Sequence, residues 1–566
     1  MKKLLILYII LISVNLQAQQ VKDTVKTEVI NVTRSFEPKV QDAYKLDINP
    51  EIDQTNEKKI PVDFHIQSVP VASTFTPEKG GMAKFNAGNI IEDVYKSYAA
   101  LSAGNYTQIQ ADTYLYYPVN NKLGSALRLS HYSSQGQKKE YDNLIKPFYH
   151  TTADMLFDYK TDQSRWNIDL GYNGHIHYLQ YYYHAMPQIA IYPVPIVNTY
   201  KHNDNNFEMT VNGHFKNLFL NNIQLSYNNY WDNFDNSENS VQLATDLKFA
   251  VGSLDLKIGL LTDLVSGYSG KVHFVQDYPE TTIAYKNIDF GIAPAIQIEN
   301  DNLVIDAGAK IYYQNQDTLY KNLQFIPDIK AGLNLIYEKL TVFAGVTGNL
   351  KQNSYHELTK QNPYLRPENI ILPTLTPYDI FGGFSGAFSS SFSYEIKLGV
   401  RKIKNYPFYN FSYINWQALI GYNILYDDMN QSYFDTSFNI GVGKKFDLKL
   451  NLTYLQNDPE HMKKALFIPD FSFKSILIFH PTDKININAT LRSIGNRTYS
   501  NTSDSNLNGF TDINLGIRYN INKQFTAFLQ SNNLLGDNYQ IFFGYPVQKL
   551  QILGGVAYRF DIPKFN

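Results

Sequence analysis

The chain has 566 residues, of which 18% are charged and 14% aromatic, and its formal net charge is -2. The charged fraction lies below the roughly 25% of ordinary soluble domains, and a mean hydropathy of -0.31 argues against a bundle of membrane helices. Because phosphate binding needs concentrated positive charge, this balance predicts no nucleic-acid partner.

The first stretch reads as a signal peptide, residues 1–18. Two lysines follow Met1, and an apolar run from Leu4 to Val14 precedes a predicted cleavage after Ala18. Eleven residues are too few to cross a bilayer as a helix. We therefore expect an exported chain.

The chain contains no cysteine, which excludes disulfides, thiol chemistry and lipid attachment at a leader cysteine. No later run of eighteen apolar residues occurs in the sequence. If the chain enters a membrane it must do so as a β-barrel, because a barrel is the only other spanning form that satisfies its backbone hydrogen bonds.

Residues 19–94 are proline-rich, weakly periodic and rich in Lys, Glu and Asp. They predict an extended periplasmic arm or a vestigial plug. Within them, a β-prone string resembles the TonB box of TonB-dependent receptors: Thr27, Glu28, Val29, Ile30, Asn31, Val32 and Thr33. The resemblance implies pairing with TonB as an added strand, and an arm that docks on another envelope protein is the alternative.

Residues 95–560 read as a succession of two-faced strands. From Arg165 to Tyr178, apolar Trp166 and Ile168 alternate with polar neighbours, as a side-chain period of two requires. The same alternation recurs in five further stretches, which start at Leu254, Leu303, Leu448, Ile485 and Ile513. A soluble antiparallel sheet with one solvent-exposed face alternates in the same way. The lengths of the connections must therefore distinguish such a sheet from a membrane barrel.

Short and long connections alternate along this region. The long connections include residues 179–204, 351–377 and 405–430. The ten short turns are 120–124, 161–164, 216–221, 251–253, 300–302, 337–339, 389–391, 444–445, 481–484 and 520–523. This asymmetry predicts an all-β fold, a transmembrane antiparallel up-and-down β-barrel of about 22 strands, with short periplasmic turns and long extracellular loops.

The last strand, Leu550 to Phe560, is expected to close this barrel by pairing with the strand that starts near Tyr95. Its aromatic end, Tyr558 and Phe560, is expected at the periplasmic lipid interface. Residues 561–566 form a C-terminal tail beyond the closure.

Two further motifs indicate a family. Asn362, Pro363, Leu365, Pro367 and Glu368 occur with the spacing of the Asn-Pro-x-Leu-x-Pro-Glu motif of TonB-dependent receptor barrels. The stretch from Asn533 to Tyr539, followed by Gly544-Tyr545-Pro546, is similar to the ending of those receptors. The resemblance implies an outer-membrane barrel that takes up or passes a solute.

One departure from that family leaves a second function open. Roughly 60 residues separate Thr33 from Tyr95, which is too few for the globular plug of such receptors. The alternative is therefore a barrel that does not transport and serves as a subunit or scaffold of a secretion or envelope-assembly complex. A soluble exported all-β protein is the third possibility.

The sequence indicates neither an enzyme nor a cofactor. It shows no Ser/His/Asp order and no glycine-rich phosphate loop in a strand-to-helix context. His175, His177 and His184 could ligate a metal, but His175 and His177 fall on the polar side of one strand, and solvated lumen-facing histidines are favoured over a metal site.

Overall fold

The computed structural model describes residues 95–563 except for the following: 137–145, 184–195, 217–218, 252–253, 270–282, 301, 317–319, 367–368, 413–416, 444 and 502–505. The predicted signal peptide, the arm and the box-like segment Thr27–Thr33 lie outside the described residues. Their roles remain predictions.

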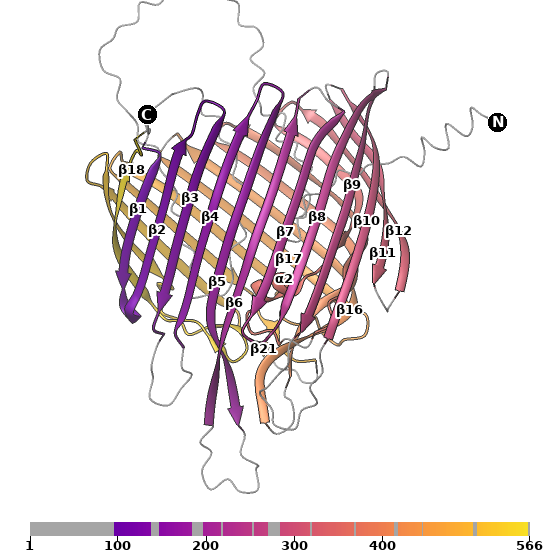
Figure 1. Cartoon of the computed structure of the whole chain (residues 1–566). Coiled ribbons are helices and arrows are strands. Elements are labelled where there is room, and N and C mark those ends of the chain that lie inside the picture. Colours follow the sequence, from indigo (N-terminus) through magenta and orange to yellow (C-terminus); the bar gives the residue numbers. More distant parts are fainter. Residues whose placement is uncertain are drawn as a thin grey trace, which may run out of the picture.

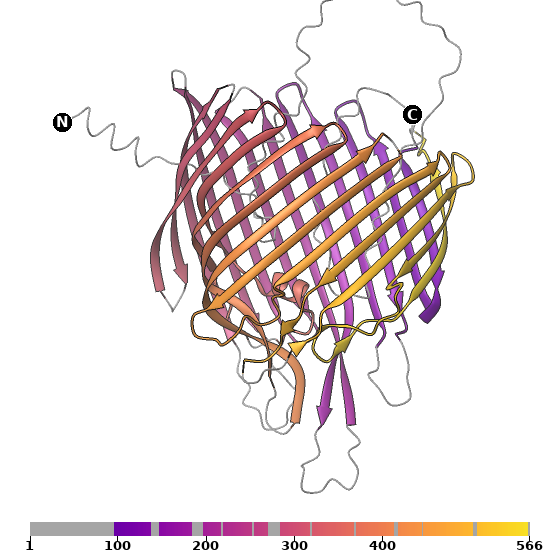
Figure 2. The same cartoon turned by 180° about the vertical axis from the view of Figure 1, so that it is seen from behind.

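Twenty-two antiparallel strands form one closed ring (Figures 1 and 2), so the predicted barrel fold is confirmed. The strands are β1 (Ser97–Gly104), β2 (Gln108–Pro118), β3 (Leu123–Ser134), β4 (Phe148–Lys160), β5 (Ser164–Tyr183), β6 (Ile196–Phe215), β7 (Leu220–Asp232), β8 (Ser237–Val251), β9 (Leu254–Ser269), β10 (Ile283–Glu299), β11 (Leu303–Gln316), β12 (Tyr320–Ile336), β13 (Leu340–Lys351), β14 (Thr374–Ser389), β15 (Phe392–Ser412), β16 (Gln417–Val442), β17 (Phe446–Pro459), β18 (Phe471–Thr482), β19 (Ile485–Ile494), β22 (Phe510–Asn520), β23 (Phe525–Asn532) and β26 (Gln551–Phe560).

Smaller elements lie in the connections. They are η2 (Asn105–Thr107), α2 (Tyr355–Gln361), β20 (Arg497–Thr498), β21 (Asn506–Leu507), β24 (Gln540–Phe542) and β25 (Tyr545–Pro546). Among the described residues, no helix is long and apolar enough to cross a membrane.

All ten predicted short turns join consecutive strands at one end of the barrel, which also holds Ser97 and Phe560. The described parts of the longer connections lie at the opposite end, here called the mouth (Figure 1, lower edge). The side chain of Asn120 in one short turn accepts hydrogen bonds from the amides of Lys122 and Leu123 at 2.8 and 2.9 Å. Turn residues of this kind explain why the short turns could be predicted from the sequence.

The outer face of the barrel is apolar. In β10, Phe290 and Ile292 point outward and are 49% and 45% exposed, while Asp289 and Ala293, which flank the pair, are buried on the inner face. Leu, Ile, Val, Phe and Tyr side chains are exposed in the same way around the ring. Such a surface is stable in hydrocarbon, and the chain is a transmembrane barrel of the outer membrane.

The inner face carries buried polar and charged groups, several of which pair with one another. Lys310 is fully buried, donates to the carbonyl of Gly348 at 3.0 Å and lies 3.4 Å from Asp328. The ammonium group of Lys397 lies 3.9 Å from the centre of the Phe381 ring. The wall is therefore polar inside and apolar outside, as the alternating sequence predicts.

The ring closes where predicted, by antiparallel pairing of β1 with β26 from Ser97 opposite Phe560 to Gly104 opposite Leu553. The Tyr558 ring points outward and lies 5.6 Å from the ring of Phe560. Asp561 in the tail accepts a hydrogen bond from the Lys96 amide at 2.9 Å, which ties the two ends of the closing strands together. The position of Tyr558 at a lipid interface remains a prediction.

Two adjacent glycines in β26 offer a matched test of this closure. A Cβ atom at Gly555 would lie 2.6 Å from the Leu101 carbonyl oxygen and would overlap the Phe528 ring, whereas a Cβ at Gly554 meets nothing within 4 Å. We expect Gly555→Val to destabilise the barrel by about 1–3 kcal/mol and Gly554→Val to leave it unchanged. The temperature at which the folded form disappears on a denaturing gel measures this, and equal melting of the two variants would contradict it.

Candidate functional site

Residues 352–373, here called the mouth segment, connect β13 to β14 and fold inward across the mouth of the lumen. The segment opens with the short helix α2, which lies inside the outline of the barrel in Figures 1 and 2. Ser354 is the N-cap and accepts a hydrogen bond from the Glu357 amide at 3.0 Å. Ser followed three residues later by Glu is a helix-start signal that sequence reasoning overlooked.

The start of α2 is held by acidic residues of one wall. The Glu238 carboxylate from β8 accepts hydrogen bonds from the amides of Tyr355 and His356, at 2.6 and 3.1 Å. The Tyr285 hydroxyl from β10 donates to the same carboxylate at 2.5 Å. Glu208 from β6 lies 3.5 Å from the His356 side chain. A buried glutamate that serves three donors is a strong anchor.

The other half of the mouth segment is held by β16. The Arg366 amide donates to the Tyr422 carbonyl at 2.8 Å, and the Tyr422 amide donates to the Tyr364 carbonyl at 3.0 Å. The Asn369 side chain accepts a hydrogen bond from the Ile424 amide at 2.7 Å. Tyr422 and Ile424 precede Met429, where β16 begins to pair with β17, so this second anchor lies on the extension of the β15–β16 hairpin beyond the ring. The start of that extension, residues 417–420, pairs with the end of β5.

The receptor-like motif forms the centre of this bridge. Asn362 and Leu365 are fully buried, and the Tyr364 amide donates to the Asn362 side chain at 3.1 Å. Pro367 and Glu368 lie outside the described residues. The function of the motif remains a prediction, but its described residues lie in the lumen and not in the wall.

The two motifs singled out in the sequence meet in space. The Tyr364 ring stacks on the Tyr545 ring with an angle of 11° between their planes. The Tyr422 hydroxyl donates to the Phe543 carbonyl at 2.7 Å. These contacts belong to one apolar cluster in the mouth: Tyr230, Tyr355, Leu358, Leu365, Ile371, Phe411, Tyr422, Ile424, Ile494, Phe510, Ile541, Phe542, Tyr545 and Val547. The mouth therefore has its own hydrophobic core.

Arg497 in β20 joins two of the connections that build this core. Its guanidinium donates to the carbonyls of Ile541 and Gln540 at 2.7 and 2.8 Å and lies 5.3 Å from the centre of the Phe510 ring. Burial lowers the pKa of Arg497 to about 10, so the side chain keeps its charge at neutral pH. It replaces water as the donor to carbonyls that the fold has buried.

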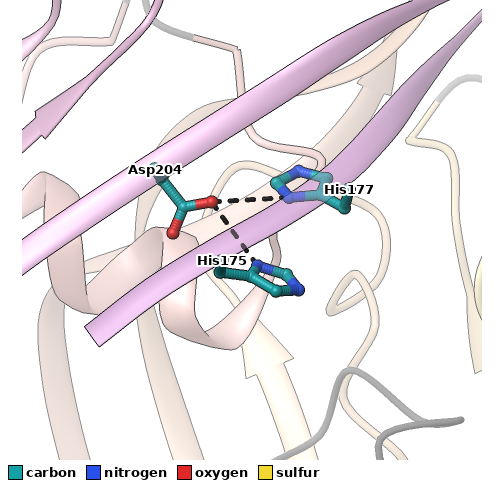
Figure 3. Close-up of side chains that lie close together, drawn as sticks. All are labelled: His175, His177 and Asp204. Carbon is teal, nitrogen blue, oxygen red and sulfur yellow. Dashed lines mark ion pairs between the residues drawn. The ribbon is translucent and has the colours of Figure 1, made fainter. Parts of the chain in front are cut away.

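Two histidines and one aspartate, His175, His177 and Asp204, lie close together beside the mouth segment (Figure 3). The Nδ1 atoms of His175 and His177 on β5 each lie 3.4 Å from Oδ1 of Asp204 on β6. His177 is only 5% exposed. The expectation of a solvated side chain is therefore wrong for His177, and His184 lies outside the described residues.

The group extends to the mouth segment and to β7. Nε2 of His177 lies 2.7 Å from the Pro363 carbonyl oxygen and 3.2 Å from Nδ1 of His202. Nε2 of His202 lies 2.9 Å from Oδ2 of Asp232. Sequence reasoning missed His202, Asp204 and Asp232, because only the register of β5 against β6 places Asp204 opposite His175 and His202 opposite His177.

The anchor at Glu238 leads to a specific prediction. Replacement by Ala removes three hydrogen bonds to a buried carboxylate, each worth about 1.5–3 kcal/mol. We expect the mouth segment of Glu238→Ala to be cleaved by protease at least about 100-fold faster while the barrel stays folded. Glu299→Ala, at the exposed far end of β10, is the control. Equal cleavage of both variants would show that Glu238 does not hold the segment.

No protein-family model matches the sequence, and no curated protein matches it. The fold is similar to that of several solved structures. The ferripyoverdine receptor of the outer membrane of Pseudomonas aeruginosa is 11% identical, with a TM-score of 0.60 over 82% of this chain and 72% of that one. The ferric-catecholate import receptor Fiu from E. coli K12 is 11% identical, with a TM-score of 0.59 over 82% of each chain.

The copper transporter OprC is a third such structure, at 10% identity, with a TM-score of 0.60 over 82% of this chain and 80% of that one. At these identities the likeness concerns the fold. It confirms the predicted barrel fold, which these outer-membrane receptors and this transporter share.

Proposed function

We propose that this protein is an outer-membrane receptor that takes up a solute through its lumen, and that the mouth segment closes the lumen on the extracellular side. The observation that carries the proposal is the double anchoring of residues 352–373 to β8 and to β16. A barrel of 22 strands encloses a lumen that such proteins keep plugged. The mouth segment supplies a closure from a loop.

The orientation follows from the connections. Short turns face the periplasm in barrels of this type, and long loops face the outside. The mouth segment and the histidine group would then meet an arriving solute first. The similar structures are named for ferripyoverdine, ferric catecholate and copper. Iron complexes and copper are therefore the solutes to be offered first.

Energised uptake is the part of the proposal that rests on the N-terminal arm. Deletion of Thr27–Thr33 should reduce uptake, and growth on the limiting nutrient, to the level of a strain that lacks the protein, because the strand that pairs with TonB would be lost. Deletion of the seven residues 53–59, elsewhere in the arm, is the matched control. Normal uptake without Thr27–Thr33 would remove TonB from the proposal.

A scaffold role is the second candidate, and the short span between Thr33 and Tyr95 favours it. A barrel subunit of a secretion or envelope-assembly complex should co-purify with the other subunits of that complex after mild detergent extraction. A monomer that takes up a solute would rule this candidate out.

A further inference from the structure

We infer that His175, His177 and Asp204 form a binding site for one divalent transition-metal ion at the mouth of the barrel. The site goes beyond the proposed uptake function, because it can be tested on the purified protein without any transported solute. The three residues face inward from β5 and β6 (Figure 3). Two histidines at alternate positions of one strand share a face, and the register places Asp204 directly opposite His175.

The distances fit a small ion. The Nδ1 atoms of His175 and His177 lie 3.4 Å from the same Asp204 oxygen, and the three atoms lie within 4.8 Å of one another. An ion such as zinc, bound at about 2.0–2.1 Å in tetrahedral geometry, separates its ligand atoms by about 3.3–3.4 Å. Two of the three ligand separations therefore already have the required length.

The hydrogen bonding around His177 makes Nδ1 the ring atom that can ligate a cation. A carbonyl oxygen can only accept, so Nε2 of His177, 2.7 Å from the Pro363 carbonyl, carries the proton. In a neutral ring Nδ1 is then a bare lone pair, and it faces a carboxylate oxygen. Both Nδ1 of His177 and Oδ1 of Asp204 are buried without a hydrogen-bond partner in the described part of the chain. A metal ion between them would satisfy both atoms.

The surroundings hold the ligands in position. Nδ1 of His202 lies next to Nε2 of His177, and Asp232 holds the other nitrogen of His202. Partners of this kind fix the orientation of metal-ligating histidines. Two imidazoles and one carboxylate suit zinc, copper, nickel or iron better than calcium or magnesium. Three protein ligands leave a coordination position for water or for a ligand that enters the lumen.

Zinc binding to the full chain in detergent tests the site. After treatment with a chelator, the wild-type barrel should bind one equivalent of Zn²⁺ by calorimetry. Asp204→Asn and His175→Gln should weaken binding by at least about 100-fold. His214→Gln is the control, because His214 is an exposed histidine on the same strand as Asp204. No binding by the wild type, or equal loss in the control, would overturn the inference.

A second readout needs no variant and covers the case in which a substitution impairs folding. Bound Zn²⁺ should protect His175, whose side chain is 21% exposed, and not His214, from acylation by diethyl pyrocarbonate in the wild-type barrel. If His177 is instead an imidazolium paired with Asp204, Zn²⁺ will give no protection at neutral pH, and the metal site is wrong.

Discussion

Replacement of residues 355–371 by a short Gly-Ser linker should make cells sensitive to vancomycin, an antibiotic too large for ordinary porins. The linker removes α2, the contacts with Glu238 and the contacts with β16 that hold the mouth segment. A 22-stranded barrel without its closure leaves a wide channel, so we expect the inhibitory concentration to fall on the order of ten-fold or more.

The control for this variant is the same linker in place of residues 460–464, which lie in another connection at the same end and are largely exposed. Both variants must reach the membrane as folded barrels, as judged by heat-modifiable migration. If the two strains are equally resistant, something other than the mouth segment closes the lumen.

A disulfide that locks the mouth segment to β16 should abolish uptake. An added Cβ atom at Gly421 would lie 2.5 Å from Cγ of Arg366, whose place the sulfur of a cysteine would take. The three atoms nearest to this added Cβ do not include Cβ of Arg366, and the third of them lies 3.5 Å away. The two Cβ atoms are therefore separated as a disulfide requires. Because the chain has no cysteine, Arg366→Cys with Gly421→Cys forms the only possible pair.

The locked variant is tested in a medium in which loss of the protein slows growth. Oxidised cells should grow like the strain without the protein, and reduced cells like the wild type, because the segment must move for a solute to pass. Each single-cysteine variant controls for the substitution itself. Undiminished growth of the oxidised double variant would mean that this contact stays closed during uptake.

The wall of the barrel was predictable because its determinants are local. A side-chain period of two and polar turn residues are visible in any stretch of ten residues, and the stretch Leu303 to Ile311 is the first part of the observed β11. The closure between β1 and β26 followed from the even strand number and from the need to leave no free edge.

The mouth was not predictable because its contacts join distant parts of the chain. His177 meets the carbonyl of Pro363, and Tyr364 meets Tyr545, only after the loops have folded into the lumen. A period of two says which residues face inward, but it does not say which inward residue a loop will touch. Within the mouth segment, the Asn362 to Glu368 motif indicated a family but none of these contacts, and the Ser354-x-x-Glu357 spacing was the local signal for the start of α2.

Single-channel recording in planar bilayers tests the closure of the lumen by the mouth segment most directly. The wild-type barrel should be silent or nearly so, and the variant with a linker in place of residues 355–371 should conduct as a wide, open channel under the same conditions. Equal conductance of the two proteins, whether both are open or both are closed, would contradict the assignment of the closure to this segment.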